Sequence, residues 1–122
     1  MIYLILPSFN EEKNLVKMFK KINNLSIARN IVVILIDDCS SDNTKIFRFN
    51  KSKFKTIYKK HKKNRGLSIA LETGFNIAKL KAKKNDFIIT MDSDNTHPIK
   101  IIPKMINVMK KNESDIVIAS RF

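Results

Sequence analysis

The stretch IVVILIDDCSSD, residues 31–42, joins six apolar residues rich in β-branched side chains to a polar loop that begins with two aspartates. A short apolar run bounded by turn-forming residues is typical of a strand buried on both faces. Asp37 and Asp38 stand where this strand ends, so they are placed either to bind a base or ribose hydroxyl or simply to form the turn. The residues alone leave both interpretations open.

The same pattern recurs on both sides of this stretch. Apolar runs at 3–6, 55–58, 87–91 and 116–119 predict four further strands, and helical spacing predicts helices over 15–22, 67–78 and 102–109, with a short one at 43–47. Such an alternation predicts a Rossmann-like α/β fold, a mostly parallel sheet with helices on both faces. In such sheets ligands bind outside the carboxyl ends of the strands.

Length and composition restrict the class of protein. The chain has 122 residues, 43% of them hydrophobic, and a single cysteine, Cys39, which cannot form an internal disulfide. These values predict one globular domain and exclude a disordered or low-complexity chain. The longest apolar run falls far short of the roughly 20 residues that span a bilayer. The N-terminus lacks the basic region of a signal peptide, so we expect a cytoplasmic protein.

The net charge of +13 favours an anionic partner, because 24 basic residues face only 11 acidic ones. Lysine is, however, most often simply solvated, and the basic stretch 51–65 carries only two aromatics, Phe54 and Tyr58. We therefore expect no nucleic-acid partner, while an anionic membrane surface stays open as a peripheral binding site.

The acidic residues are more informative than the basic ones. Seven of the 11 follow the first, second and fourth predicted strands: Glu11, Glu12, Asp37, Asp38, Asp42, Asp92 and Asp94. Parallel strands bring these loops to one edge of the sheet. Asn10 is expected to cap the first helix, with acids favoured in its first turn, and Asp42 to cap locally.

Asp92 and Asp94 are two residues apart at a strand end, so their side chains can leave the sheet in one direction. At about 6–7 Å, two carboxylates repel by roughly 2–3 kcal/mol at an effective dielectric constant near 20. Mg²⁺ or Mn²⁺ offsets this repulsion, and a diphosphate can complete the oxygen shell. The alternative is that Asp92 caps the following turn and Asp94 is solvated.

Five motifs occur in order along the chain: IYLILPSFNEEKNL, IVVILIDDCSSDNT, KNRGLSIALETGFNIAK, DFIITMDSDNTHPIKIIPKM and DIVIASRF. Together they resemble the donor-binding half of a family 2 glycosyltransferase, and most of all the polyprenyl-phosphate sugar synthases of the dolichyl-phosphate mannose synthase type. The resemblance covers essentially all of residues 1–122. It implies a GT-A fold and inverting transfer from a GDP- or UDP-linked sugar, with Mg²⁺ or Mn²⁺ as cofactor and a polyprenyl phosphate or another glycan or lipid as acceptor.

The resemblance also implies two sets of site residues. It places Asp94 and Thr96 at the metal. The remaining residues would contact the donor: Pro7, Phe9, Glu11, Ile36, Asp38, Asp92, Ser93 and Arg121. No general base is identifiable.

In the family that these motifs resemble, the acceptor is held by sequence beyond the position of Phe122. The resemblance therefore implies that residues 1–122 are a single donor-binding domain that lacks the C-terminal acceptor part, supplied by a missing half or a partner chain. One alternative is a donor-binding fragment without turnover. Another is a receiver-like signalling domain, suggested by Asp38 and Asp92, although a full strand and helix precede IDD.

Overall fold

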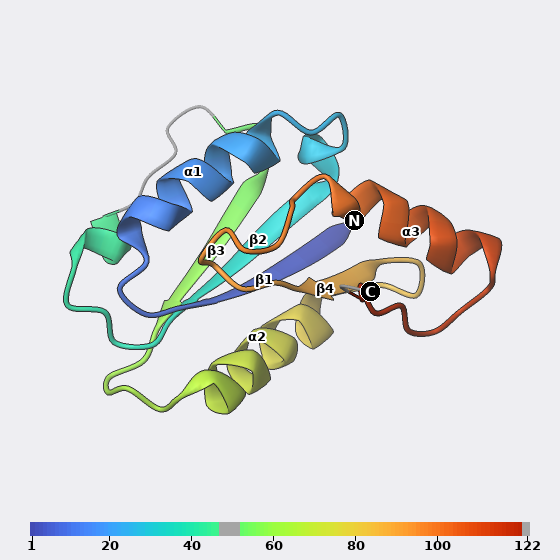
Figure 1. Ribbon diagram of the computed structural model, residues 1–122. Helices are drawn as coiled ribbons and strands as arrows, with labels where there is room; N and C mark the ends of the chain where they lie inside the picture. The colour runs from blue at the N-terminus through green and yellow to red at the C-terminus, as the bar shows by residue number, and fades with distance from the viewer. Residues whose placement is uncertain (47–51, 121–122) are drawn as a thin grey trace.

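The computed structural model describes residues 1–46 and 52–120, in which four strands form one parallel sheet (Figure 1). The strands are β1 (Ile2–Ser8), β2 (Ile31–Asp37), β3 (Lys55–Lys60) and β4 (Phe87–Thr90), in the order β3-β2-β1-β4. β1 and β2 pair from Ile2↔Ile31 to Ser8↔Asp37, so both end at the same edge of the sheet. The predicted parallel sheet is confirmed.

Helices cover both faces of this sheet, as the alternating pattern predicts. The helices α1 (Glu12–Asn23) and α3 (Ile101–Lys111) lie on one face, and α2 (Leu67–Lys81) lies on the other (Figure 1). Two 3₁₀ helices, Ala28–Asn30 and Asn43–Ile46, lie in the connections, the second where a short helix is predicted. This arrangement is the Rossmann-like α/β fold.

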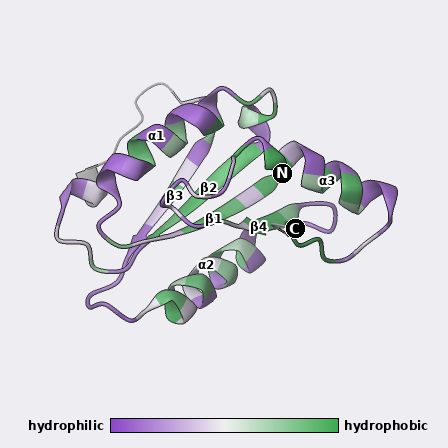
Figure 2. Ribbon diagram, viewed as in Figure 1, coloured by the Kyte–Doolittle hydropathy of each residue, from purple (hydrophilic) through white to green (hydrophobic). Residues whose placement is uncertain are grey.

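The core consists of two apolar layers, one on each side of the sheet. Along β1, Leu4 and Leu6 pack toward α1 and α3, whereas Tyr3 and Ile5 pack toward α2, because successive side chains of a strand point to opposite faces. Most residues of the two central strands, β1 and β2, are apolar (Figure 2). Each fully buried Leu or Ile contributes about 1.5–3 kcal/mol to folding.

Gly74 lets α2 lie directly against β1. A Cβ atom at this position would lie 2.4 Å from Cγ2 of Ile5, a side chain that is itself fully buried. Only glycine permits this approach without a shift of the helix or the strand. The contact places the middle of α2 against the middle of β1.

The fifth predicted strand, at 116–119, is a correction: in the described part of the chain this segment has no strand structure. Ile116 and Ile118 are 78% and 83% exposed. A strand needs a neighbour to satisfy its backbone N–H and C=O groups, and among the described residues β4 pairs with β1 alone. The apolar run therefore has strand composition without strand pairing.

The start of α1 also differs from the prediction. The N-cap position is Glu11 rather than Asn10, and no side chain at that position caps the helix. Instead, Asp42, from the loop after β2, accepts a hydrogen bond from the Glu12 N–H at 3.1 Å. Asn10 has φ +54°, and its Oδ1 accepts the Ser41 N–H at 2.8 Å. The capping role of Asp42 is confirmed, since it also accepts the Thr44 N–H at 3.0 Å.

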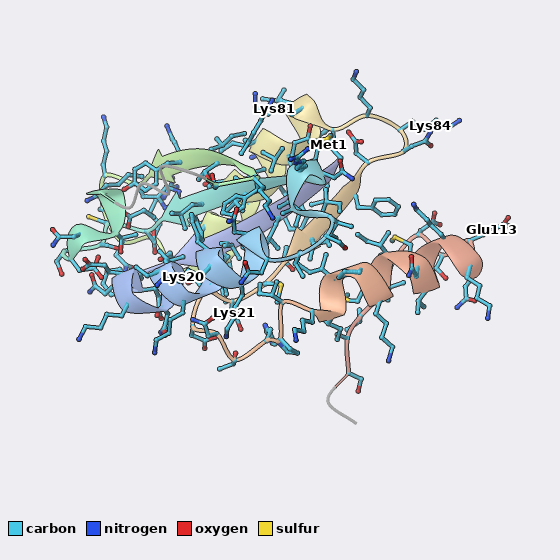
Figure 3. All side chains as sticks on the ribbon, turned by 90° about the horizontal axis from the view of Figure 1, so that it is seen from above. Met1, Lys20, Lys21, Lys81, Lys84 and Glu113 are labelled. Atoms are coloured by element: carbon cyan, nitrogen blue, oxygen red, sulfur yellow. The ribbon has the colours of Figure 1, made fainter. Side chains whose placement is uncertain are left out.

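Lysine side chains are distributed widely over the surface. Figure 3 labels Lys20 and Lys21 on α1, and Lys81 and Lys84 at and beyond the end of α2; all four are exposed. None of the helices in the described residues is long and apolar enough to cross a bilayer.

Candidate donor site

A cleft of about 360 Å³ opens at the carboxyl ends of β1, β2 and β4, next to the start of α2. Most of the predicted site residues meet there, although they come from three separate loops. The lining residues are Pro7, Ser8, Phe9, Glu11, Asp38, Asn64, Gly66, Leu67, Ala70, Asp92, Ser93 and Asp94.

Three predicted residues are not part of this lining. Ile36 is fully buried in the core on the α2 side, beneath the cleft rather than in its wall. Thr96 is exposed and contacts Asp94. Arg121 lies outside the described residues.

Asp38 joins three segments of the cleft wall. Its Oδ1 accepts hydrogen bonds from His61 Nδ1 at 2.7 Å and from the Arg65 N–H at 2.9 Å, and its Oδ2 accepts the Gly66 N–H at 2.8 Å. Burial acts to raise the pKa of this carboxyl group, but these hydrogen bonds outweigh burial and leave the pKa below its ordinary value. The carboxylate thus fixes the loop between β3 and α2.

His61 connects this carboxylate to α2. A carboxylate only accepts, so Nδ1 carries the hydrogen of the bond to Asp38, while Nε2 lies 2.9 Å from Thr73 Oγ1. Thr73 also donates to the Ile69 carbonyl oxygen at 2.9 Å. These hydrogen bonds link the carboxylate of Asp38 through His61 to α2.

Asp37, the neighbour of Asp38, faces into the protein. It is fully buried, and it accepts the Ser40 N–H at 2.8 Å and the Tyr58 hydroxyl at 2.5 Å. Burial, together with the bond to Asp37, raises the pKa of Tyr58 above its ordinary value. Asp37 therefore forms the turn, which was one of the two interpretations of the Asp-Asp pair.

The loop after β4 presents the second pair of carboxylates. Asp92 and Asp94 are exposed, whereas Ser93 between them is buried and donates from Oγ to the Pro7 carbonyl oxygen at 2.8 Å. Asp94 Oδ1 accepts from Thr96 Oγ1 at 2.7 Å and from the Thr96 N–H at 2.9 Å. These bonds hold the pKa of Asp94 below its ordinary value, so its carboxylate is charged at neutral pH.

The chemistry of these donors fits a hard divalent cation. Carboxylate and hydroxyl oxygens are the ligands that Mg²⁺ and Mn²⁺ prefer, and such ions usually keep part of their shell for water or phosphate oxygens. Among the described residues, His, Cys, Asp and Glu form no group of three or more able to hold a metal. Water or the oxygens of a bound diphosphate would complete the shell of a cation at Asp94.

Several cleft residues were not predicted from the sequence. Ser8, Asn64, Leu67 and Ala70 line the cleft, and His61 supports it from below. The sequence pattern could have indicated Asn64 and Gly66. Both lie in the loop at the carboxyl end of β3, and ligands of parallel sheets bind at such strand ends. Gly66 has φ +88°, a conformation that favours glycine.

Two named transferases are similar to this chain in sequence. The chain is 35% identical over 122 residues to dolichol-phosphate mannosyltransferase of Pyrococcus furiosus, covering 99% of this chain and 33% of that protein. It is 32% identical to the UDP-N-acetylglucosamine–dolichyl-phosphate N-acetylglucosaminyltransferase of Methanococcus voltae, covering 99% of this chain and 52% of that protein. The chain thus spans from a third to about half the length of these relatives.

Solved structures show the same fold. The structure of residues 1–349 of TarS from Staphylococcus aureus matches 93% of this chain and 33% of its own, with a TM-score of 0.67 and 21% identity. Its complex with UDP-GlcNAc matches with a TM-score of 0.65.

A family model settles the relationship, because it matches nearly the whole chain. The model described as glycosyl transferase family 2 matches residues 3–122, which include every strand end that contributes to the cleft. This match removes the receiver-like alternative. The chain belongs to glycosyl transferase family 2.

Proposed function

We propose that this domain binds the nucleoside-diphosphate sugar of a glycosyl transfer reaction in the cleft formed by Pro7–Glu11, Asp38, Gly66 and Asp92–Asp94. The observation that carries the proposal is the meeting of these segments at one edge of a parallel sheet, with two exposed carboxylates at its rim. The UDP-GlcNAc named in the TarS complex supports a UDP-linked donor, and a GDP-linked donor is the alternative.

Different residues of the cleft would contact different parts of the donor. Phe9 is 49% exposed at the cleft and offers an aromatic face to a base, while Pro7, Leu67 and Ala70 supply apolar wall. The loop held by Asp38 closes the side toward α2.

The carboxylate of Asp94 would bind a divalent cation. Thr96 is hydrogen-bonded to Asp94, and Asp92, two residues earlier, is exposed like Asp94. A divalent cation bound there would offset the negative charge of the diphosphate and of the leaving nucleotide.

A polyprenyl phosphate is the acceptor that we favour, since two relatives carry dolichol phosphate in their names. We assign donor binding to residues 1–122. We assign acceptor binding to polypeptide that corresponds to the part of those relatives that this chain does not match. Holding the acceptor in line can be worth about 7–11 kcal/mol, so we expect poor transfer by this chain alone. The charge of +13 favours a peripheral position on an anionic, cytoplasmic membrane face.

Thermal unfolding with UDP- and GDP-linked sugars, with and without Mn²⁺, tests donor binding. Ligand at about 100 times its dissociation constant stabilises by about 2.7 kcal/mol, a rise on the order of 10 °C in melting temperature. Asp94→Asn should remove the Mn²⁺-dependent part of this rise. Asp115→Asn, an exposed aspartate that does not line the cleft, is the matched control and should keep it. An unchanged shift in Asp94→Asn would refute the metal assignment.

Turnover is tested separately with radiolabelled GDP-mannose or UDP-glucose, Mn²⁺ and polyprenyl phosphate in detergent. Transfer at several per second, within the ordinary range of about 1–10³ s⁻¹, would contradict the assignment of acceptor binding to other polypeptide.

A further inference from the structure

We propose that Asn95 is a positioning residue that ties the carboxylate loop after β4 to helix α1 and so holds Asp94 in place for a divalent cation. This inference rests on the proposed function, and it concerns a residue of this chain to which neither the family resemblance nor the comparisons assign a role. It starts from the way in which the loop is attached to the rest of the domain.

Asp94 lies between two anchored neighbours. On one side, Ser93 Oγ donates to the Pro7 carbonyl oxygen at 2.8 Å, which fixes the loop to the end of β1. On the other side, Asn95 Nδ2 donates to the Asn14 carbonyl oxygen of α1 at 2.7 Å. Asp94 itself is exposed, so packing does not restrain its side chain. Its position therefore depends on the two anchors and on Thr96.

The backbone of Asn95 is adapted to this contact. Its φ is +64°, in the left-handed region that asparagine tolerates better than other residues with a Cβ. This turn carries the Asn95 side chain away from the carboxylate rim and toward α1. Lys21 Nζ donates to Asn95 Oδ1 at 3.2 Å, so both ends of the Asn95 amide contact α1.

The anchor on α1 also reaches the β1–α1 loop of the cleft. Asn14 Nδ2 donates to Glu11 Oε2 at 2.7 Å, and Glu11 lines the cleft. Because Asn95 bonds chiefly to the backbone carbonyl of Asn14, the two contacts can be separated by mutation. Residues that orient ligand side chains typically change metal affinity about 10- to 100-fold when they are replaced.

Asn95→Gly removes the side-chain amide that ties the loop to α1, and it keeps the turn because glycine adopts the positive φ without strain. Asn14→Ala is the matched control: it keeps the carbonyl acceptor of Asn95 and removes the contact to Glu11. Each protein, with saturating UDP, is titrated with Mn²⁺, and protein-bound Mn²⁺ is measured by the enhancement of water proton relaxation. Melting temperature without metal verifies that each variant is folded.

We expect Asn95→Gly to weaken Mn²⁺ binding at least about 10-fold, while Asn14→Ala binds Mn²⁺ like the wild type. Wild-type affinity in Asn95→Gly would overturn the positioning role, and so would an equal loss in both variants, which would place the effect on the Asn14 side chain. No relaxation enhancement with the wild-type chain, in titrations with UDP and again with GDP, would instead overturn the proposed metal-dependent donor binding and this inference with it.

Discussion

Replacing Asp38 by alanine should destabilise the domain far more than replacing it by asparagine. In Asp38→Ala, His61 Nδ1 and the N–H groups of Arg65 and Gly66 all lose their acceptor. Arg65 and Gly66 are exposed, so water can replace the carboxylate for their amides. His61 is only 6% exposed, so its Nδ1 stays without a partner, although Nε2 keeps its contact with Thr73. Leaving a buried polar group without its hydrogen-bond partner costs about 1–3 kcal/mol, and more where the lost partner is charged, so we expect a loss of about 3 kcal/mol.

Asparagine can keep most of these bonds. If its Nδ2 faces His61, the Nδ1 of a neutral imidazole accepts that hydrogen, and Nε2–H donates to Thr73. The Oδ1 of the asparagine then takes the place of Oδ2 of Asp38 and accepts from Gly66. The Arg65 N–H loses its 2.9 Å acceptor and keeps only the 3.1 Å contact to the other oxygen. The acceptor also loses its charge, a difference of about 1 kcal/mol between a charged and a neutral hydrogen bond.

Urea unfolding without nucleotide measures both free energies, and calorimetry measures the melting temperatures. For a domain of this size, a loss of about 3 kcal/mol corresponds to roughly 10–15 °C in melting temperature. Asp38→Asn should lose roughly 3–6 °C. An Asp38→Ala protein within about 1 kcal/mol of the wild type, or an asparagine variant as unstable as the alanine variant, would refute the structural role of the carboxylate.

One further substitution and a change of pH should alter the stability of the fold. Gly74→Ala should destabilise by about 1–3 kcal/mol, because a Cβ would lie 2.4 Å from Ile5 Cγ2; equal or higher stability in urea would show that α2 moves away freely. Acid should also destabilise the fold, since the pKa of Asp38 is lowered from 3.8: this stabilisation is complete above about pH 4 and is lost as the pH falls through the folded-state pKa. Urea unfolding between pH 5 and about pH 2.5 should show a shallower loss for Asp38→Asn than for the wild type.

The elements that could be predicted from the sequence are those whose apolar side chains pack against other elements of the described residues. β1 and β2 read as continuous apolar runs because helices cover both of their faces, and both runs are strands of the sheet. The run at 116–119 has the same composition but no strand structure, because pairing depends on a neighbour that no local pattern reports. The same limit explains Asn10: the acceptor that caps α1 is Asp42, 30 residues away from Glu12 in sequence.

The clustering of acidic residues at one edge indicated a site, but it combined carboxylates of two different kinds. Asp37 and Asp38 are 0% and 5% exposed, and each accepts hydrogen bonds from the protein itself, so their charge is used to hold loops. Asp92 and Asp94 are exposed at the rim.

Sequence spacing cannot separate these two kinds of carboxylate, since both follow buried strands; burial and hydrogen-bond partners do. We therefore propose that a cation and a diphosphate bind at the pair after β4, and that the pair after β2 shapes the wall against which the nucleoside lies. In the Asp38 variants, a loss of donor affinity should accordingly scale with the loss of folding stability. Asp94→Asn should lose donor affinity without a loss of folding stability.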